Sequence, residues 1–99
     1  MSTPPAATLT ILSGAQAGLT FTLTSTDMMI GRSSTCDICI PDPSVSRRHA
    51  RLRYSGGQWF IQDQGSSSGT TVNGQPTQAT RLQSGDVISL GRCDVRFNG

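Results

Sequence analysis

The chain has 99 residues, of which 34% are hydrophobic and 14% charged, and its formal net charge is +2 at pH 7. This length allows one domain with one core, and the mild charge gives no case for sequence-independent nucleic-acid binding, which usually needs a strongly basic face. No apolar run approaches the roughly 18 residues of a membrane-spanning helix. Eleven glycines, with many threonines and serines, favour short strands and turns over long helices.

Residues 1–7 are rich in proline, alanine and threonine, and they lack the charged and apolar regions of a signal peptide. We expect a flexible N-terminal segment over residues 1–7 and a folded domain over residues 8–99. The three cysteines are an odd number, and without an export signal they indicate a reduced, cytoplasmic setting.

Short segments of alternating apolar and polar residues follow one another along the rest of the chain. The alternation predicts strands at 9–12, 19–23, 28–30, 36–40, 49–54, 59–63, 70–72, 80–82, 87–90 and 95–97. Turn signals separate them at intervals of roughly 8–12 residues, as in a β-sandwich. Asn73-Gly74 is the strongest of these hairpin signals. In the segment 49–54, Ala50, Leu52 and Tyr54 should face one way, while His49, Arg51 and Arg53 face the other.

Three of the predicted loops carry groups that bind phosphate. Gly31-Arg32 ends one strand, Ser46-Arg47-Arg48-His49 precedes another, and Gly65–Thr70 is rich in serine and glycine. An arginine supplies a planar fork of donors that fits a phosphate, serine supplies a short hydroxyl donor, and glycine lets backbone N–H groups approach an anion. Because no lysine and no helix follow Gly65–Thr70, this loop is not a nucleotide-binding P-loop.

Other kinds of site fit these residues less well. Cys36 and Cys39 have the spacing of zinc ligands, but only Cys93 remains to complete a site, so we expect ordinary strand residues, no metal and no cofactor. An esterase would use Ser46 as nucleophile and His49 as base, but no acid is placed to orient the histidine. We therefore expect no enzyme. A nucleic-acid binder would use the arginines of segment 47–53, among which no aromatic residue is interleaved.

Taken together, the three loops resemble the forkhead-associated (FHA) domain. The family pattern runs Gly-Arg, Ser-(Arg/Lys)-x-His, Asp-x-Gly-Ser-(Thr/Ser)-Asn-Gly-Thr and Val-Asn-Gly. In this chain it corresponds to 31–32, 46–49, 63–70 and 72–74. The resemblance covers residues 9–97 and implies an all-β fold: a β-sandwich of about eleven short, mostly antiparallel strands with binding loops at one end.

The resemblance also implies a function, because members of the family bind phosphothreonine in partner proteins. Carried over by position, Arg32 and Ser46 would hold the phosphate with the help of Arg47, and Ser67 would add a hydroxyl. No catalytic residue is implied. The expected partner is a phosphothreonine-containing protein, a Ser/Thr kinase or its substrate. We expect no nucleic-acid or membrane partner, and a monomer.

Four further positions would support the site, and one departs from the family pattern. Gly31 would shape the turn at Arg32, His49 would brace the loops, and Gly69 and Asn73 would support the loop that carries Ser67. Ser68 stands where the family has an asparagine that holds the bound peptide's backbone, and serine is shorter with one donor. This departure motivates an alternative function, a protein-interaction scaffold that binds independently of phosphate.

Overall fold

The computed structural model describes residues 6–99, in which eleven strands and no helix occur. In chain order they are β1 (Thr8–Ile11), β2 (Thr20–Thr22), β3 (Asp27–Gly31), β4 (Ile38–Cys39), β5 (Ala50–Ser55), β6 (Gln58–Asp63), β7 (Thr70–Val72), β8 (Gln75–Pro76), β9 (Ala79–Leu82), β10 (Val87–Leu90) and β11 (Cys93–Asn98). Within this part of the chain, no helix could therefore span a membrane.

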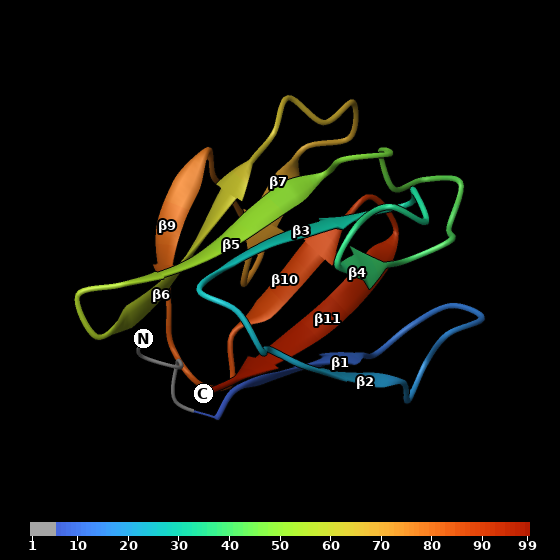
Figure 1. Cartoon of the computed structure of the whole chain (residues 1–99). Helices are drawn as coiled ribbons and strands as arrows, with labels where there is room; N and C mark the ends of the chain where they lie inside the picture. Colours follow the sequence, from blue (N-terminus) through green and yellow to red (C-terminus); the bar gives the residue numbers. More distant parts are fainter. Residues whose placement is uncertain (1–5) are drawn as a thin grey trace.

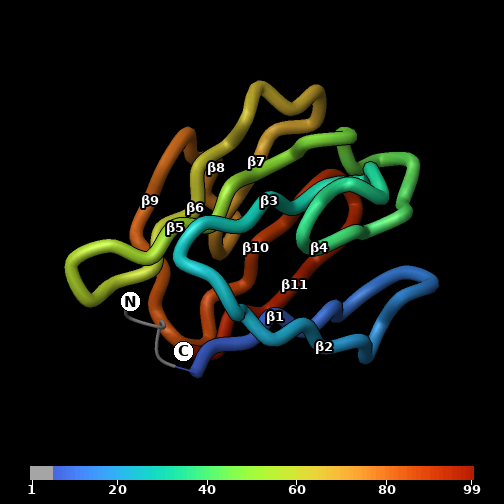
Figure 2. Tube along the Cα trace, viewed as in Figure 1, coloured from blue at the N-terminus to red at the C-terminus, as the bar shows by residue number. Residues whose placement is uncertain are grey.

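The strands form two sheets that pack face to face, as Figures 1 and 2 show. One sheet has the order β2-β1-β11-β10-β7-β8 and the other the order β4-β3-β5-β6-β9. The assigned ladders are antiparallel except that between β3 and β4, which is parallel. The predicted all-β sandwich of about eleven short strands is thus confirmed.

The core lies between the two sheets and consists of the apolar residues that alternate along the strands. Ile88 and Leu90 of β10 belong to the same core cluster as Leu52 and Ile61 of the other sheet's central strands, and all four are fully buried. Near one end of the sandwich, the Trp59 ring lies 5.3 Å from the Tyr54 ring and 6.3 Å from the Phe97 ring, centroid to centroid. These contacts hold the two sheets together at the end of the sandwich that carries the β5–β6 turn, opposite the loops singled out in the sequence.

Two strands differ from the predicted pattern. The predicted strand 36–40 is reduced to β4, because the backbone N–H of Cys36 bonds the carbonyl of Ser33 and closes a turn there. Strand β8 was not predicted, since an exposed Gln-Pro pair shows no alternation. It pairs with β7 across the expected Asn73-Gly74 turn, in which both residues have positive φ, 53° and 82°, as this hairpin type requires.

The start of the described chain is packed against the fold. Ala7 is buried, and its carbonyl accepts a hydrogen bond from the backbone N–H of Leu23. Most of the segment 1–7 that we expected to be flexible lies outside the described residues, so that expectation stays a prediction.

Candidate functional site

The three loops singled out in the sequence lie at one end of the sandwich, where β3 ends and where β5 and β7 begin (Figure 1). Backbone hydrogen bonds join the first loop to the second. The N–H of Arg32 donates to the carbonyl of Ser46 at 3.0 Å, and that of Ser33 donates to the carbonyl of Arg47 at 3.1 Å. The arginine of one loop and the serine of the other are therefore fixed beside each other.

Gly31 is required because two backbones meet at this point. A Cβ atom on Gly31 would lie 2.1 Å from the carbonyl oxygen of Arg47, well inside van der Waals contact. The residue is buried and does not have positive φ. Glycine is therefore needed here because the Arg47 backbone approaches closely, and not because of the backbone conformation of Gly31. The expected role of Gly31 in shaping the start of the Arg32 loop has this physical basis.

The second and third loops meet through Ser46 and Ser67. The Ser46 hydroxyl oxygen accepts a hydrogen bond from the backbone N–H of Ser67 at 3.1 Å, and the two hydroxyl oxygens are also 3.1 Å apart. Ser46 is half-buried and Ser67 is exposed, so the paired hydroxyls lie at the surface. Two hydroxyl groups and a backbone N–H thus converge from two loops on one point.

His49 braces this arrangement from beneath. Its Nδ1 accepts a hydrogen bond from the backbone N–H of Ser46 at 3.0 Å, and its Nε2 donates to the carbonyl of Gly69 at 2.8 Å. The ring is fully buried, unlike the side chains of Arg51 and Arg53, with which the alternation had grouped it. The residue precedes β5, and two loop hydrogen bonds draw its ring inward. With both nitrogens occupied, no hydrogen bond joins His49 to the Ser46 hydroxyl as an esterase would require.

Asp63 organises the third loop, a role that the sequence analysis did not assign. Its carboxylate accepts hydrogen bonds from the backbone N–H groups of Gly65 and Ser66 at 3.0 and 3.1 Å, and from the hydroxyls of Ser66 and Thr70. Partial burial raises the pKa of Asp63, but these hydrogen bonds outweigh it and hold the pKa below its usual value. An aspartate two residues before a glycine is the signal that could have revealed this role.

The arginine side chains at this end point outward. Arg32 is exposed, and its Nε donates to the carbonyl of Val45 at 3.0 Å. This bond orients the guanidinium along the second loop and leaves its two terminal nitrogens to bind a ligand. Arg47 is also exposed, and its backbone, but not its side chain, is held by the neighbouring loops.

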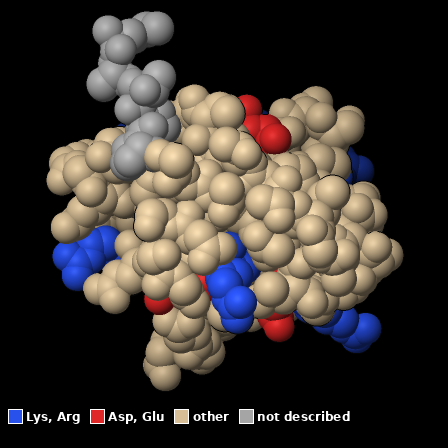
Figure 3. Space-filling view, turned by 90° about the horizontal axis from the view of Figure 1, so that it is seen from below, with Lys and Arg blue, Asp and Glu red and all other residues tan. Residues whose placement is uncertain are grey.

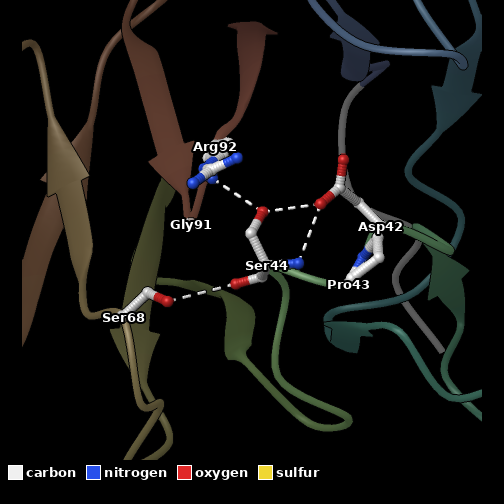
Figure 4. A pocket seen from close by; sticks show the side chains of 6 residues that line it. All are labelled: Asp42, Pro43, Ser44, Ser68, Gly91 and Arg92. Atoms are coloured by element: carbon white, nitrogen blue, oxygen red, sulfur yellow. Dashed lines mark hydrogen bonds between the residues drawn. The ribbon is translucent and has the colours of Figure 1, made fainter.

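Ser68, which follows Ser67 in the third loop, borders a hollow of about 720 Å³. In Figure 4 its hydroxyl points to the backbone of Ser44 and donates to that carbonyl at 3.1 Å. The Ser44 hydroxyl in turn donates to Asp42 at 2.6 Å and accepts from the backbone N–H of Arg92 at 2.8 Å. Hydrogen bonds from Ser44 hold the pKa of Asp42 below its usual value. The hollow is lined by Asp42, Pro43, Ser44, Ser68, Gly91 and Arg92.

Asn73 lies outside this constellation. Its side chain accepts a hydrogen bond from the backbone N–H of Val87 and donates one to Asp86, both at 2.9 Å. These contacts hold the β7–β8 turn to the start of β10. Asn73 and Ser67 lie at opposite ends of β7, and the hydrogen bonds of the Asn73 side chain all go to Asp86 and Val87.

The cysteines form no metal site. Cys36 and Cys39 are free thiols whose sulfurs donate to the carbonyls of Arg47 and Arg32, at 3.1 and 3.5 Å. Cys93 is buried in the core. No group of three possible metal ligands occurs among residues 6–99. The Cys36 and Cys39 thiols instead hydrogen-bond backbone carbonyls of the first two loops.

The positive charges of the chain are dispersed. All eight basic residues are arginines, and all six acidic residues are aspartates. On the face that Figure 3 shows, arginine side chains stand in separate patches between uncharged residues and do not form a continuous stripe. A stripe along the surface is the electrostatic footprint of most nucleic-acid binders.

Comparison with known proteins places this chain in a family. The model of the FHA domain matches residues 28–91, which include all three loops. The chain therefore belongs to the FHA domain family.

Several characterised proteins are similar to it. The chain is 39% identical to the oxoglutarate dehydrogenase inhibitor of Corynebacterium glutamicum over 91 residues, 92% of this chain and 64% of that protein. It is 38% identical to the glycogen accumulation regulator GarA of Mycolicibacterium smegmatis, over 92% of this chain and 58% of that protein. FhaA of Mycobacterium tuberculosis is 39% identical over 80% of this chain, which is 15% of FhaA. The chain thus spans less than two thirds of each of these relatives.

Solved structures agree with this assignment. An FHA domain analysed for phosphothreonine-dependent interactions superposes with a TM-score of 0.87 at 36% identity, covering 95% of this chain and 96% of that one. The FhaA FHA domain, solved in complex with the intracellular domain of Rv3910, has a TM-score of 0.85 at 37% identity and covers 93% and 99% of the two chains.

Proposed function

We propose that this domain binds a phosphothreonine-containing segment of a partner protein on the loops that carry Arg32, Ser46 and Ser67. The observation that carries the proposal is the contact between Ser46 and Ser67, which brings two hydroxyls and a backbone N–H together beside an exposed arginine. A phosphate offers three acceptor oxygens and a charge of about −1.5 to −2 at neutral pH. An unmodified threonine offers neither.

Each group has a distinct part in this proposal. The Arg32 guanidinium would pair with two phosphate oxygens, and Arg47 would add charge from the second loop. The hydroxyls of Ser46 and Ser67, which lie 3.1 Å apart, would turn outward and donate to the remaining oxygens. Charge-assisted hydrogen bonds of this kind contribute about 1.5–3 kcal/mol each. Three of them give a useful affinity for a short peptide.

The hollow beside Ser68 would take the peptide chain past the phosphothreonine. It is bordered by Ser68, the residue that follows Ser67, and by Asp42 and Arg92, so peptide side chains of either charge could form ion pairs there. Ser68 uses its hydroxyl on the Ser44 carbonyl, which leaves its oxygen as an acceptor for the peptide or for a bridging water.

The proposed role is binding without catalysis. The relatives named above include an inhibitor and a regulator, and the geometry around Ser46 gives the hydroxyl no general base. We propose a monomeric, cytoplasmic module whose partner is a Ser/Thr kinase or a substrate of one. Phosphorylation of the partner would then control the association.

An oriented library of phosphothreonine peptides, titrated against the domain, tests the proposal. The controls are the matching unphosphorylated and phosphoserine peptides and an Arg32→Ala variant. We expect binding that requires both the phosphate and Arg32. The variant should lose at least about tenfold in affinity, which corresponds to one charge-assisted bond at the low end of its range. A folded domain that binds no member of the library would contradict the proposal.

One observation favours a second function, a scaffold that binds its partner independently of phosphate. Ser68 replaces the asparagine of the family pattern, and its hydroxyl is used in a hydrogen bond to the Ser44 carbonyl. A scaffold of this kind would bind phosphorylated and unphosphorylated partner peptides equally well. The same titration therefore separates the two functions.

A further inference from the structure

A row of four exposed side chains crosses the outer face of the second sheet. In the strand register, Asp27 of β3 lies opposite Arg53 of β5, Arg53 opposite Phe60 of β6, and Phe60 opposite Arg81 of β9. Side chains directly opposite one another in antiparallel strands have Cβ atoms about 4.5–5.5 Å apart. An aromatic ring therefore stands between two arginines, a grouping hidden in the sequence because each residue comes from a different strand.

Phe60 is one of the three large hydrophobic residues exposed in the described part of the chain, with 36% of its surface accessible. Its neighbours Trp59 and Ile61 point into the core, so Phe60 must point outward. Beside it lies a hollow of about 320 Å³. This hollow is lined by Arg53, Ser55, Phe60, Ile61, Gln62 and Ala79.

The charges on this face are unbalanced. Asp27 pairs with Arg51 at 2.8 Å, which is the one salt bridge found within residues 6–99. Arg53 and Arg81 consequently have no carboxylate partner there, and Arg81 donates only to the side-chain oxygen of Gln58, at 3.3 Å. No acidic residue lines the hollow. Two uncompensated positive charges thus flank an exposed aromatic ring.

We propose that the Arg53–Phe60–Arg81 surface, defined by these three residues and the hollow beside them, binds an acidic protein segment that carries a hydrophobic side chain. The hydrophobic side chain would enter the hollow against the Phe60 ring. Carboxylates on either side of it would pair with the two guanidiniums. Exposed arginine and aromatic side chains are the residue types enriched where proteins bind each other.

A protein segment fits this surface better than a nucleic acid does. Binding of single strands uses several aromatic side chains, on which successive bases stack, along a positively charged groove. Here one aromatic ring and two arginines form a compact patch, on a chain whose net charge is only +2. A patch of this size can accommodate one hydrophobic side chain with acidic residues on either side of it.

The surface is separate from the phosphate-binding loops, yet one partner could reach both. Arg53 lies three residues along β5 from Ala50, where that strand begins beside the loops, and three residues of strand span about 10 Å. A partner that contacts both places gains affinity because the second contact forms intramolecularly. This added affinity rests on the proposed function, whereas binding at the Arg53–Phe60–Arg81 surface alone does not.

Amide chemical-shift mapping tests the inference with a short synthetic peptide in which aspartates surround one phenylalanine and no residue is phosphorylated. We expect the largest shifts on β5, β6 and β9 around the three residues, and weaker binding as salt is raised. The double variant Arg53→Gln/Arg81→Gln should lower the affinity about tenfold, since two exposed ion pairs are lost. The matched control is Arg96→Gln, an exposed arginine on the other sheet.

Several results would overturn the inference. They are an absence of shifts on β5, β6 and β9, equal affinities of the double variant and wild type, or tighter binding of a single-stranded oligonucleotide to the same face. Shifts confined to residues 31–35 and 44–48 would show that the peptide only mimics phosphate. An Arg32→Ala variant separates the two proposals: it should lose the phosphothreonine peptide and keep the acidic one. Phe60→Thr should weaken only the acidic peptide.

Discussion

The hydroxyl oxygen of Ser46 accepts a hydrogen bond from the backbone N–H of Ser67, across a sequence separation of 21 residues. This bond joins two loops that precede different strands of different sheets, β5 and β7. Beneath it, His49 bonds the backbone of the same two loops. The surface that would receive a phosphate is therefore set in place before any ligand arrives, which lowers the entropic cost of binding.

The shape of the Arg32 side chain should matter as much as its charge. Arg32→Lys keeps the positive charge but removes the planar fork and the Nε hydrogen bond to the Val45 carbonyl. We expect at least a tenfold loss of affinity for a phosphothreonine peptide, measured by calorimetric titration. Arg96→Lys, on the opposite sheet, serves as the control and should bind like wild type. Equal affinities for Arg32→Lys and wild type would show that only charge is used.

Restoring the family residue at position 68 should strengthen peptide binding. An asparagine there has both a donor and an acceptor and reaches further than serine, whose hydroxyl is used on the Ser44 carbonyl. One added hydrogen bond corresponds to about a twofold to tenfold gain in affinity for the phosphopeptide. Ser84→Asn, a matched change at an exposed site away from the loops, should have no effect. If Ser68→Asn bound the phosphopeptide more weakly than wild type, the bound peptide would not pass through the hollow.

The buried ring of His49 should contribute strongly to stability. His49→Ala removes the hydrogen-bond partners of the Ser46 N–H and the Gly69 carbonyl and leaves a cavity. We expect the free energy of unfolding in urea to fall by about 2–4 kcal/mol, and phosphopeptide binding to weaken because both loops lose their brace. A change below about 0.5 kcal/mol, the level of an ordinary surface substitution, would show that the ring is not a brace.

Stability at acid pH should depend on Asp63. Four hydrogen bonds hold its pKa in the folded protein below the unfolded value of about 3.9. The folded state therefore binds the proton less readily, so this contribution is complete above that pH and is lost as pH falls through the lowered pKa. The Asp63→Asn variant should be less stable than wild type at neutral pH, and its stability should decline less steeply as the pH falls below about 4. The free energy of unfolding in urea is measured for both proteins at each pH. Curves for the variant and wild type that run parallel across the acid range would contradict this prediction.

Most of the fold could be predicted from the chain, because alternation of apolar residues sets strands such as β5, β6 and β10. The strand boundaries were harder to predict where hydrogen bonds in the loops override the alternation of apolar and polar residues. Cys36 was assigned to a strand but lies in a turn, and β8 has a polar pair that carries no pattern. The orientation of His49 depends on partners in two other segments, which only the folded chain brings together.

The candidate site was predictable to a similar degree. Arg32, Ser46 and Ser67 are found together at one end, as the order of their motifs indicated. The family resemblance implied that Asn73 supports the loop that carries Ser67. Its side chain instead bonds Val87 and Asp86, and β7 separates it from that loop. The Arg53–Phe60–Arg81 row could not be seen at all, since it depends on the register of three strands.

The central claim, recognition of phosphothreonine on these loops, is tested most directly by amide chemical shifts. The domain is titrated with one phosphothreonine peptide selected from the library and with the same peptide unphosphorylated. We predict large shifts for the amides of Arg32, Ser46 and Ser67 with the phosphorylated peptide alone. Equal shifts with both peptides, or shifts elsewhere on the domain, would contradict the account.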